Sequence, residues 1–346
     1  MTNNKSKKIL IAGGTGYIGS HIAVILIERG YQVFIIDNLI NSDIETLDRI
    51  EKITGVKSDF ENIDLADKKQ VDKFFKAHHS FDAVIDFAAL KAAGESVNMS
   101  KEYHDNNVNS IVYLLDAMKE YKINNLIYPS SACVYGDPDS LPVREDMEIK
   151  KANTPYGETK IIAERLIKKV CIDNSDFASI VFRFFNAAGA HDTGLLGELP
   201  KGVPSNLIPF VSQTAAGIRD ELKIFGNDYD TDDGYSVRDY IHVVDLARAH
   251  VIAVEKLLGA NVDKNFEIYN LGVGRGYSVK EVVDTFERVN KIKINSKIVD
   301  RRSGDIAEIY ADSSLANKEL GWKAEKNLED IVSSAWKWEK HLRGIN

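Results

Sequence analysis

The chain has 346 residues, of which 44% are hydrophobic and 28% are charged. This composition is typical of a globular protein, and the length favours two lobes, or one large sheet with an added domain, over a single ordinary core. The formal net charge of −8 argues against a general nucleic-acid binder, since no long run of lysine and arginine offsets it.

The sequence also argues against membrane insertion, a disulfide framework and a metal centre. The apolar run Ile9 to Ala12 has the length of a strand, and the run Ile22 to Ile27 is soon interrupted by charge, so neither indicates a signal peptide or a membrane span. We therefore expect a cytoplasmic protein. Cys133 and Cys171 lack the spacing of a zinc site and are expected to be buried thiols, and the eight histidines form no ligand motif.

The first half of the chain alternates short apolar runs with stretches of helical period. This alternation predicts repeated βαβ units, and hence an α/β protein with a Rossmann-type doubly wound parallel sheet. The predicted strands are Ile9–Ala12, Gln32–Asp37, Phe81–Phe87, Asn125–Ser131 and Ser179–Phe184. The predicted helices are Tyr17–Arg29, Lys68–His78, Tyr103–Tyr121 and Pro155–Val170. Proline suits the first turn of the last of these helices, where its missing N–H costs no hydrogen bond.

The regular alternation ends near His191. A stretch that carries glycine and proline, 194–209, and a turn-rich segment, 226–234, precede a helical pattern that resumes near Val243. This change of pattern predicts a second, smaller lobe.

A further strand pattern, Phe266–Leu271, is predicted to rejoin the large sheet. The two lobes are then not contiguous in sequence. We predict one domain, built on the large sheet, over 1–187 that regains segments near 238–272, and a discontinuous α/β lobe made mainly of 188–346.

A glycine-rich turn directly follows the first predicted strand. Gly14-x-Gly16-x-x-Gly19, preceded by Gly13, opens the first predicted helix. Glycines permit the tight turn and the close approach of backbone to a pyrophosphate, and the amides of the helix start meet the anion. Asp37, eighteen residues past Gly19, ends the second strand, where a carboxylate accepts from both hydroxyls of the adenosine ribose and repels a 2′-phosphate. The pattern predicts NAD rather than NADP as the cofactor.

Four polar residues indicate redox chemistry on a sugar hydroxyl. Ser130 and Ser131 end a predicted strand, whose carboxyl end faces the ligand crevice in such a sheet. Tyr156 and Lys160 lie four residues apart on a predicted helix and so share one face. A tyrosine base needs its pKa lowered by several units from about 10, and a cation about 4 Å away, with the positive nicotinamide, supplies about that much. Serines that satisfy their own loop, and an exposed Tyr-Lys pair, remain the alternatives.

Several segments strengthen this interpretation by their order and spacing. They are the glycine turn, Phe87 to Ser96, Ser130 to Gly136, Pro155 to Lys160, Arg183 to Asn186 and Gly234 to His242. Together they resemble the extended short-chain dehydrogenase/reductases, specifically the UDP-glucose 4-epimerases, over nearly the whole chain. The resemblance implies an isomerase, commonly a homodimer, that keeps NAD bound and interconverts UDP-galactose and UDP-glucose through a 4-keto sugar with transient NADH.

The resemblance also implies a role for individual residues. Tyr156 is the base, Lys160 lowers its pKa and holds the nicotinamide ribose, and Ser131 hydrogen-bonds the reacting hydroxyl. The implied NAD-binding residues are Gly13, Gly16, Tyr17, Ile18, Gly19, Asp37, Asn38, Asp64, Leu65, Phe87, Ala88, Lys91, Asn106, Ser130, Tyr156, Lys160 and Phe184. The implied UDP-sugar-binding residues are Ser131, Tyr156, Asn186, Asn206, Phe225, Arg238, Arg302, Asp305 and Ile309.

Two positions depart from the family's pattern. Ala89 replaces the glycine of the family's Phe-Ala-Gly-Leu-Lys run beside the cofactor. Ile309 stands where family members limit the space at sugar C2: a tyrosine goes with the plain hexose, and a small residue goes with N-acetylhexosamines. The intermediate isoleucine predicts glucose and galactose as the main substrates, with partial access for N-acetylated ones. A 4-epimerase of UDP-N-acetylhexosamine or of another nucleotide sugar is the alternative.

Three other functions fit the sequence less well. A sugar-nucleotide 4,6-dehydratase needs an Asp-Glu pair directly after the hydroxyl residue, where this chain has Ala132 and Cys133. A plain reductase would exchange its cofactor rather than retain it. A cofactor-sensing regulatory protein would have no reason to keep Ser131, Tyr156 and Lys160 together.

Overall fold

The computed structural model describes residues 7–259, 264–302 and 305–345. The chain divides into two compact units, each made of three separate segments. The first unit comprises Met1–Gly136, Glu148–Phe184 and Ala247–Tyr269, and the second comprises Asp137–Met147, Phe185–Leu246 and Asn270–Asn346. Two of these boundaries differ from the predicted ones. The segment 137–147 lies in the second unit, and 238–246 stays there because its strands pair within that unit.

The first unit contains a seven-stranded parallel sheet, which confirms the predicted Rossmann-type architecture. Its order is β11-β6-β5-β4-β1-β2-β3, so the late strand rejoins the sheet next to β6, as predicted. The strands are β1 (Lys8–Ala12), β2 (Gln32–Asp37), β3 (Asp59–Asn62), β4 (Ala83–Asp86), β5 (Asn125–Ser131), β6 (Ala178–Phe184) and β11 (Phe266–Leu271).

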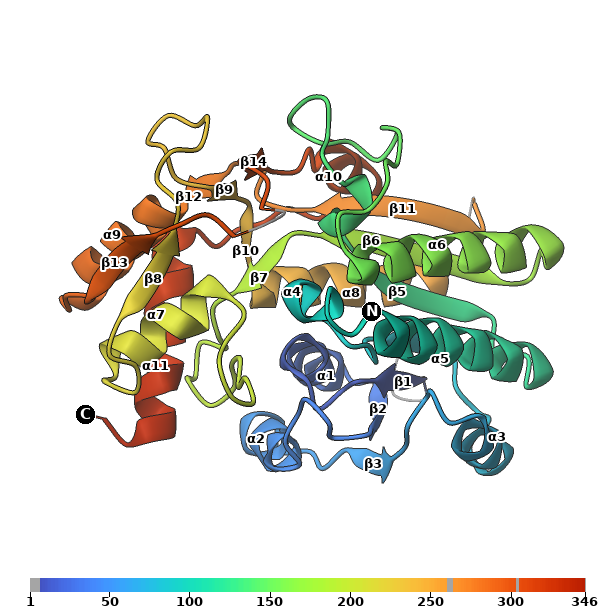
Figure 1. Cartoon of the computed structure of the whole chain (residues 1–346). Helices are drawn as coiled ribbons and strands as arrows, with labels where there is room; N and C mark the ends of the chain where they lie inside the picture. Colours follow the sequence, from blue (N-terminus) through green and yellow to red (C-terminus); the bar gives the residue numbers. More distant parts are fainter. Residues whose placement is uncertain (1–6, 260–263, 303–304, 346) are drawn as a thin grey trace. The chain divides into compact units, whose positions relative to one another are not determined.

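Helices cover both faces of this sheet (Figure 1). They are α1 (Tyr17–Glu28), α2 (Glu45–Thr54), α3 (Lys68–Ala77), α4 (Ala93–Ser96), α5 (Ser100–Glu120), α6 (Pro155–Asp173) and α8 (Val243–Leu257), with a 3₁₀ helix over Ala132–Tyr135. On one face α3, α5 and α6 bury an apolar core that includes Phe74, Leu114 and Ile167. On the other face α1 packs on β1 and β2, and the ring of His250 in α8 lies 4.8 Å from that of Phe182 in β6. Because both faces are buried, the inner strands such as β1 and β4 are mainly apolar, whereas the edge strand β3 is not.

The second unit combines short strand pairs with helices. Its strands are β7 (Asn186–Ala188), β8 (Leu222–Phe225), β9 (Val237–Arg238), β10 (Tyr240–His242), β12 (Tyr277–Ser278), β13 (Ser296–Val299) and β14 (Glu308–Ile309). They pair as β10-β7, β13-β8 and β12-β9-β14. The helices are α7 (Leu207–Ala215), α9 (Val279–Asn290), α10 (Ser314–Leu320) and α11 (Leu328–Arg343). Helices α9 and α11 each begin with a capping box and pack through Phe286 and Trp336, whose ring centres are 6.1 Å apart.

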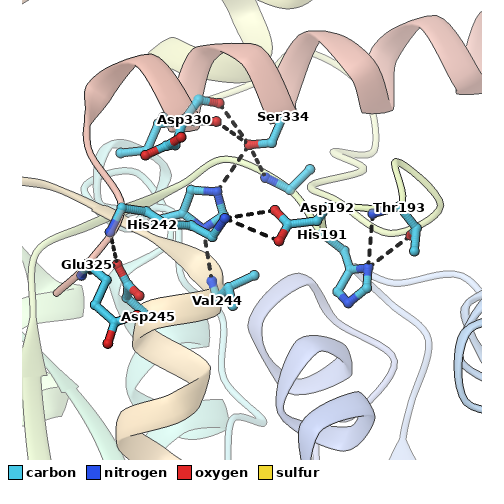
Figure 2. Close-up of polar contacts among 12 residues, drawn as sticks. His191, Asp192, Thr193, His242, Val244, Asp245, Glu325, Asp330 and Ser334 are labelled. Carbon is cyan, nitrogen blue, oxygen red and sulfur yellow. Dashed lines mark hydrogen bonds and ion pairs between the residues drawn. The ribbon is translucent and has the colours of Figure 1, made fainter. Parts of the chain in front are cut away.

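A buried polar group holds α11 in this unit (Figure 2). His242, at the end of β10, shares a hydrogen bond of 3.1 Å with Ser334 of α11, whose hydroxyl also donates to the backbone of Asp330. The Asp245 carboxylate accepts from the backbone N–H of Glu325, which lies just before the helix. The second unit therefore depends on contacts with the last helix of the chain.

None of the helices in the described part of the chain has the length and the apolar run needed to cross a membrane.

Candidate active site

The glycine turn packs directly against the end of β4. Gly13 has a φ of +74°, and a Cβ there would lie 2.8 Å from the carbonyl carbon of Phe87. A Cβ on Gly19 would lie 2.5 Å from the backbone oxygen of Gly13. Side chains are therefore excluded from both positions, and the turn presents bare backbone, as a pyrophosphate cradle requires.

The turn leads into α1 without an opposing charge. Gly16 is the N-cap; the first turn of the helix carries no acidic residue, and no side chain in the described ranges caps it. The positive end of a helix and its backbone N–H groups attract an anion. The start of α1 therefore fits the pyrophosphate of NAD, which is the cofactor that the sequence predicts.

Asp37 ties the end of β2 to the same turn. Its Oδ2 accepts a hydrogen bond of 3.3 Å from the Thr15 N–H, and its Oδ1 accepts from the Leu39 N–H and the Ser42 hydroxyl, each at 2.9 Å. A carboxylate accepts about four hydrogen bonds, so Oδ2 retains room for a further donor. Three protein groups thus hold the carboxylate in place and use most of its capacity.

The start of α6 brings Tyr156 and Lys160 into the protein interior. Thr154 caps the helix and Pro155 occupies its first turn, as predicted. Tyr156 is 8% exposed and Lys160 is 4% exposed, so the pair is not an exposed helix surface. The Lys160 Nζ lies 5.9 Å from the centre of the Tyr156 ring and donates to the Pro129 carbonyl at 2.8 Å. The predicted shared face is confirmed.

The protein alone does not lower the pKa of Tyr156. Burial raises this pKa, nearby Cys133 raises it further, and the hydrogen bond with Ser131 lowers it only in part. Burial also lowers the pKa of Lys160 to about 8. The sequence argument gave the lysine cation a separation of about 4 Å from the phenol. That estimate neglected burial, which opposes both charges, so the positive nicotinamide has to supply a larger share of the effect.

Glu164 and Arg183 form a buried ion pair next to the strand end that carries Ser130 and Ser131. Glu164 of α6 accepts from the Nε and Nη2 of Arg183 at 3.0 and 2.7 Å, and from the Ser130 hydroxyl at 2.5 Å. The Arg183 Nη1 also donates to the Tyr135 hydroxyl at 3.1 Å. The network joins β5, β6, α6 and the 3₁₀ helix that follows Ser131. The single O–H donor of Ser130 is used here, so its hydroxyl can contact a cofactor only as an acceptor.

The other predicted cofactor residues of the first unit lie in loops and at element ends, except Asn106, which lies within α5. Asn38 and Asp64 each accept a hydrogen bond from a backbone N–H two residues on. Leu65 is buried in the apolar core, and Lys91 is exposed. The partly buried members of the set are Tyr17 and Ile18 at the start of α1, with Asn38, Asp64, Phe87, Ala88, Asn106 and Phe184.

Asn107, which sequence reasoning missed, holds the loop that carries Lys91. Its Oδ1 accepts from the Leu90 N–H at 2.8 Å, and its Nδ2 donates to the Leu90 carbonyl at 3.0 Å and to the Thr159 hydroxyl at 3.2 Å. The residue thus links the loop after β4 to the start of α6. The only sequence signal is an asparagine at a buried helical position.

Two arginines of the second unit share one carboxylate. Arg302 donates to Asp305 at 2.9 and 3.3 Å, and the Arg238 Nη2 lies 3.8 Å from the same carboxylate. The Arg302 guanidinium also lies 5.0 Å from the centre of the Phe225 ring. Ile309 is buried and pairs with Arg238 between β14 and β9. The structure thus groups five of the predicted substrate residues, with two cations for one anion, which suits a diphosphate.

Asn186 and Asn206 lie on other elements of this unit. Asn186 begins β7, and its N–H donates to the Asp239 carbonyl at 2.9 Å, between Arg238 and Tyr240. Asn206 is the N-cap of α7, and its Nδ2 donates to Glu198 at 2.8 Å.

Tyr229 is a second residue that sequence reasoning missed. Arg301 lies over its ring at 4.1 Å, and its hydroxyl is buried without a hydrogen-bond partner among the described residues. A buried unpaired hydroxyl is costly, so a bound ligand is a natural partner for it. The turn-rich sequence around it gave no sign of this arrangement.

The fold and these side chains define a class of protein. A doubly wound sheet with a glycine turn after β1, and with serine, tyrosine and lysine together beyond β5, is that of an extended short-chain dehydrogenase/reductase. Residues 10–335 match the family model described as GDP-mannose 4,6 dehydratase.

Known proteins narrow this assignment. The chain is 46% identical to a UDP-glucose 4-epimerase of Haemophilus influenzae, over 96% of this chain and 97% of that protein. It is 42% identical to UDP-glucose 4-epimerases of Bifidobacterium longum, solved with NAD+ and UDP, and of Stenotrophomonas maltophila, solved with NAD and formylated UDP-arabinopyranose. Both comparisons give a TM-score of 0.93 and cover 98% of this chain and 100% of the other. The chain belongs to the family of the UDP-glucose 4-epimerases.

Proposed function

We propose that this protein is an NAD-dependent 4-epimerase that interconverts UDP-galactose and UDP-glucose. The observation that carries the proposal is the buried group of Ser131, Tyr156 and Lys160 in a chain whose relatives are epimerases over nearly their full length. Ala132 and Cys133 argue against dehydration, because neither side chain can replace the required aspartate and glutamate.

The residues of this chain supply binding and proton transfer. The glycine turn and the start of α1 hold the pyrophosphate, and Asp37 holds the ribose. When bound, NAD supplies the acceptor for the hydride of sugar C4. Tyr156 takes the proton of the 4-hydroxyl, Ser131 orients that hydroxyl, and the charge of Lys160 favours the phenolate. Once the 4-keto sugar presents its other face and C4 regains a hydride there from the reduced cofactor, Tyr156 returns the proton to the oxygen and the epimer forms.

The second unit binds the UDP group in this proposal. Arg238 and Arg302 contact the diphosphate, and Phe225 contacts the uridine. Two observations support the roles of the two arginines. The Asp305 carboxylate positions both guanidinium groups, and the three side chains together carry one excess positive charge.

The direct test is to incubate the purified protein with UDP-galactose, without added NAD, and to assay UDP-glucose. Conversion is expected, because the cofactor is retained through purification. Absence of conversion, in protein shown to contain NAD, would reject this substrate pair and point to an N-acetylated or pentose UDP-sugar.

Ile309→Tyr tests how far N-acetylated substrates are accepted. The larger ring should lower kcat/KM for UDP-N-acetylgalactosamine by about 10-fold or more, with kcat/KM for UDP-galactose largely retained. Ile309→Leu keeps the side-chain volume and is the matched control. An N-acetyl activity that is unchanged by tyrosine would show that Ile309 does not limit the space at C2.

A homodimer in the cytoplasm belongs to the same proposal and rests on the family resemblance. Light scattering on the purified protein measures the mass, and a monomer would refute the dimer.

A further inference from the structure

Asp86 and Tyr128 lie side by side on the sheet of the first unit. In β4 and β5, Val84 pairs with Leu126 and Ile85 with Ile127, so Asp86 comes next to Tyr128. Residues side by side in parallel strands direct their side chains to the same face. This face is the one covered by α6, because Tyr128 belongs to the core that α3, α5 and α6 bury. The register thus places a carboxylate beside a phenol under the helix of Lys160.

Tyr128 contacts Lys160 directly. The Lys160 Nζ donates to the Tyr128 hydroxyl at 3.2 Å and to the Pro129 carbonyl at 2.8 Å, and it lies 4.6 Å from the centre of the Tyr128 ring. An ammonium group has three N–H donors. Two of them are directed at the end of β5, so the third is left for the side on which Tyr156 and a cofactor lie.

Of the two carboxylates that influence Lys160, only Asp86 lacks a cation within ion-pair distance among the described residues. Glu164 is matched by Arg183 in the bidentate pair described above. Asp86 accepts a hydrogen bond of 3.1 Å from the Ala88 N–H, and within the described ranges no cationic side chain lies within ion-pair distance of it. Asp86 is 3% exposed, and a buried charge without a compensating one is costly. Lys160 is the opposite charge that acts on Asp86 from beyond ion-pair distance.

The remaining titratable groups around Lys160 are weak acids. They are Tyr128 from β5, Cys133 from the 3₁₀ helix and Tyr156 from α6 itself. Burial lowers the pKa of Lys160 to about 8, and Asp86 is the largest of the effects that oppose this fall. Burial raises the pKa of Asp86 to about 6. Between these values both groups are charged.

We infer that Asp86 and Tyr128 are positioning residues of the reaction: Tyr128 fixes the direction of the Lys160 ammonium, and Asp86 keeps it protonated. The inference rests on the proposed function, since it concerns the charge that favours ionised Tyr156. Its specific consequence is that removal of the Asp86 charge shifts the loss of the Lys160 proton to lower pH.

The first test reads Lys160 without using activity. In NAD-containing protein labelled with ¹³C at lysine Cε, the signal of Lys160 is assigned by its loss in Lys160→Arg and titrated by NMR. Asp86→Asn is expected to lower the midpoint by about one pH unit. Asp82→Asn, just before the opposite end of β4, is the matched control and leaves the midpoint unchanged. An unchanged midpoint in folded Asp86→Asn protein that contains NAD would overturn the role of Asp86.

The second test uses kinetics. The alkaline limb of the kcat–pH profile should move with the NMR midpoint in Asp86→Asn, whereas a merely structural change would lower kcat at every pH without moving the limb. Tyr128→Phe keeps the ring and is the second variant if Asp86→Asn does not fold; it should lower kcat by about 10-fold with little change in KM. Tyr113→Phe, which packs against the same core, is its control. An unchanged kcat in Tyr128→Phe would show that Tyr128 is not a positioning residue of the reaction.

The two tests separate this inference from the proposed function. A shifted NMR midpoint in protein that converts no UDP-galactose would refute the proposed substrate and keep the link between Asp86 and Lys160. Full epimerase activity of the wild type, together with an unshifted midpoint in Asp86→Asn, would support the proposed function and refute the link between Asp86 and Lys160.

Discussion

Replacement of Tyr156 by phenylalanine is expected to lower kcat by about two to four orders of magnitude and to leave NAD bound. In the proposed mechanism the change removes the hydroxyl that takes the proton of the sugar, while the ring still fills its buried position. Stopped assays of UDP-glucose, with the NAD content measured after denaturation, give both numbers.

Tyr121→Phe serves as the control for this variant. Tyr121 follows α5 and stacks on Phe75 and His79, so its hydroxyl can be removed without a change at the start of α6. Equal kcat in wild type and Tyr156→Phe would show that another residue is the base. Loss of NAD in the variant would assign Tyr156 to cofactor binding rather than to proton transfer.

Replacement of Arg183 by methionine is expected to destabilise the fold by about 3–5 kcal/mol. The change leaves the Glu164 carboxylate buried without its cation and takes the Nη1 donor away from Tyr135. Ser130, which donates to Glu164, would share the disturbance. Urea denaturation followed by circular dichroism gives the free energy of unfolding.

Two further variants define the cause of that loss. Arg183→Met combined with Glu164→Met replaces the ion pair by apolar side chains and should recover much of the stability, because the unpaired charge is gone. Lys101→Met removes one member of an exposed pair with Asp105 and should cost less than about 1 kcal/mol. A small loss in Arg183→Met itself would mean that water or another donor compensates Glu164.

The strands and helices with a continuous apolar pattern could be predicted closely. Gln32–Asp37, Asn125–Ser131 and Phe266–Leu271 are found with the predicted ends. The start of α5 and the end of α6 each differ by three residues from the predicted positions. Polar residues at helix ends leave no periodic signal in the sequence.

The elements without such a pattern were missed. Strand β3 reads Asp-Phe-Glu-Asn and lies at the edge of the sheet, so none of its residues is fully buried. Helix α2 buries only Thr46 and Ile50 in its ten residues. Both elements form because they pair or pack with neighbouring elements. Their own sequences contain too few apolar residues to show a strand or helix pattern.

The candidate site shows the same limit in chemical terms. The spacing of Tyr156 and Lys160 and the glycine turn are local, so the sequence was enough to single them out. The contacts around these residues join parts of the chain that are distant in sequence. Lys160 contacts Tyr128, thirty-two residues away, and in the neighbouring network Arg183 contacts Tyr135, forty-eight residues away. The direction of the Tyr156 pKa depends on burial, which no spacing rule supplies.

The position of β11 constrains how the protein is made. This strand pairs with β6, yet residues 185–246 of the second unit separate the two in the chain. A nascent or truncated chain that stops near residue 187 would expose the full edge of β6, with its backbone groups unpaired and open to another molecule. A sheet unit made from its first half alone would therefore lack its last strand, and ribosomal synthesis must pass residue 271 before that strand is available to close the edge.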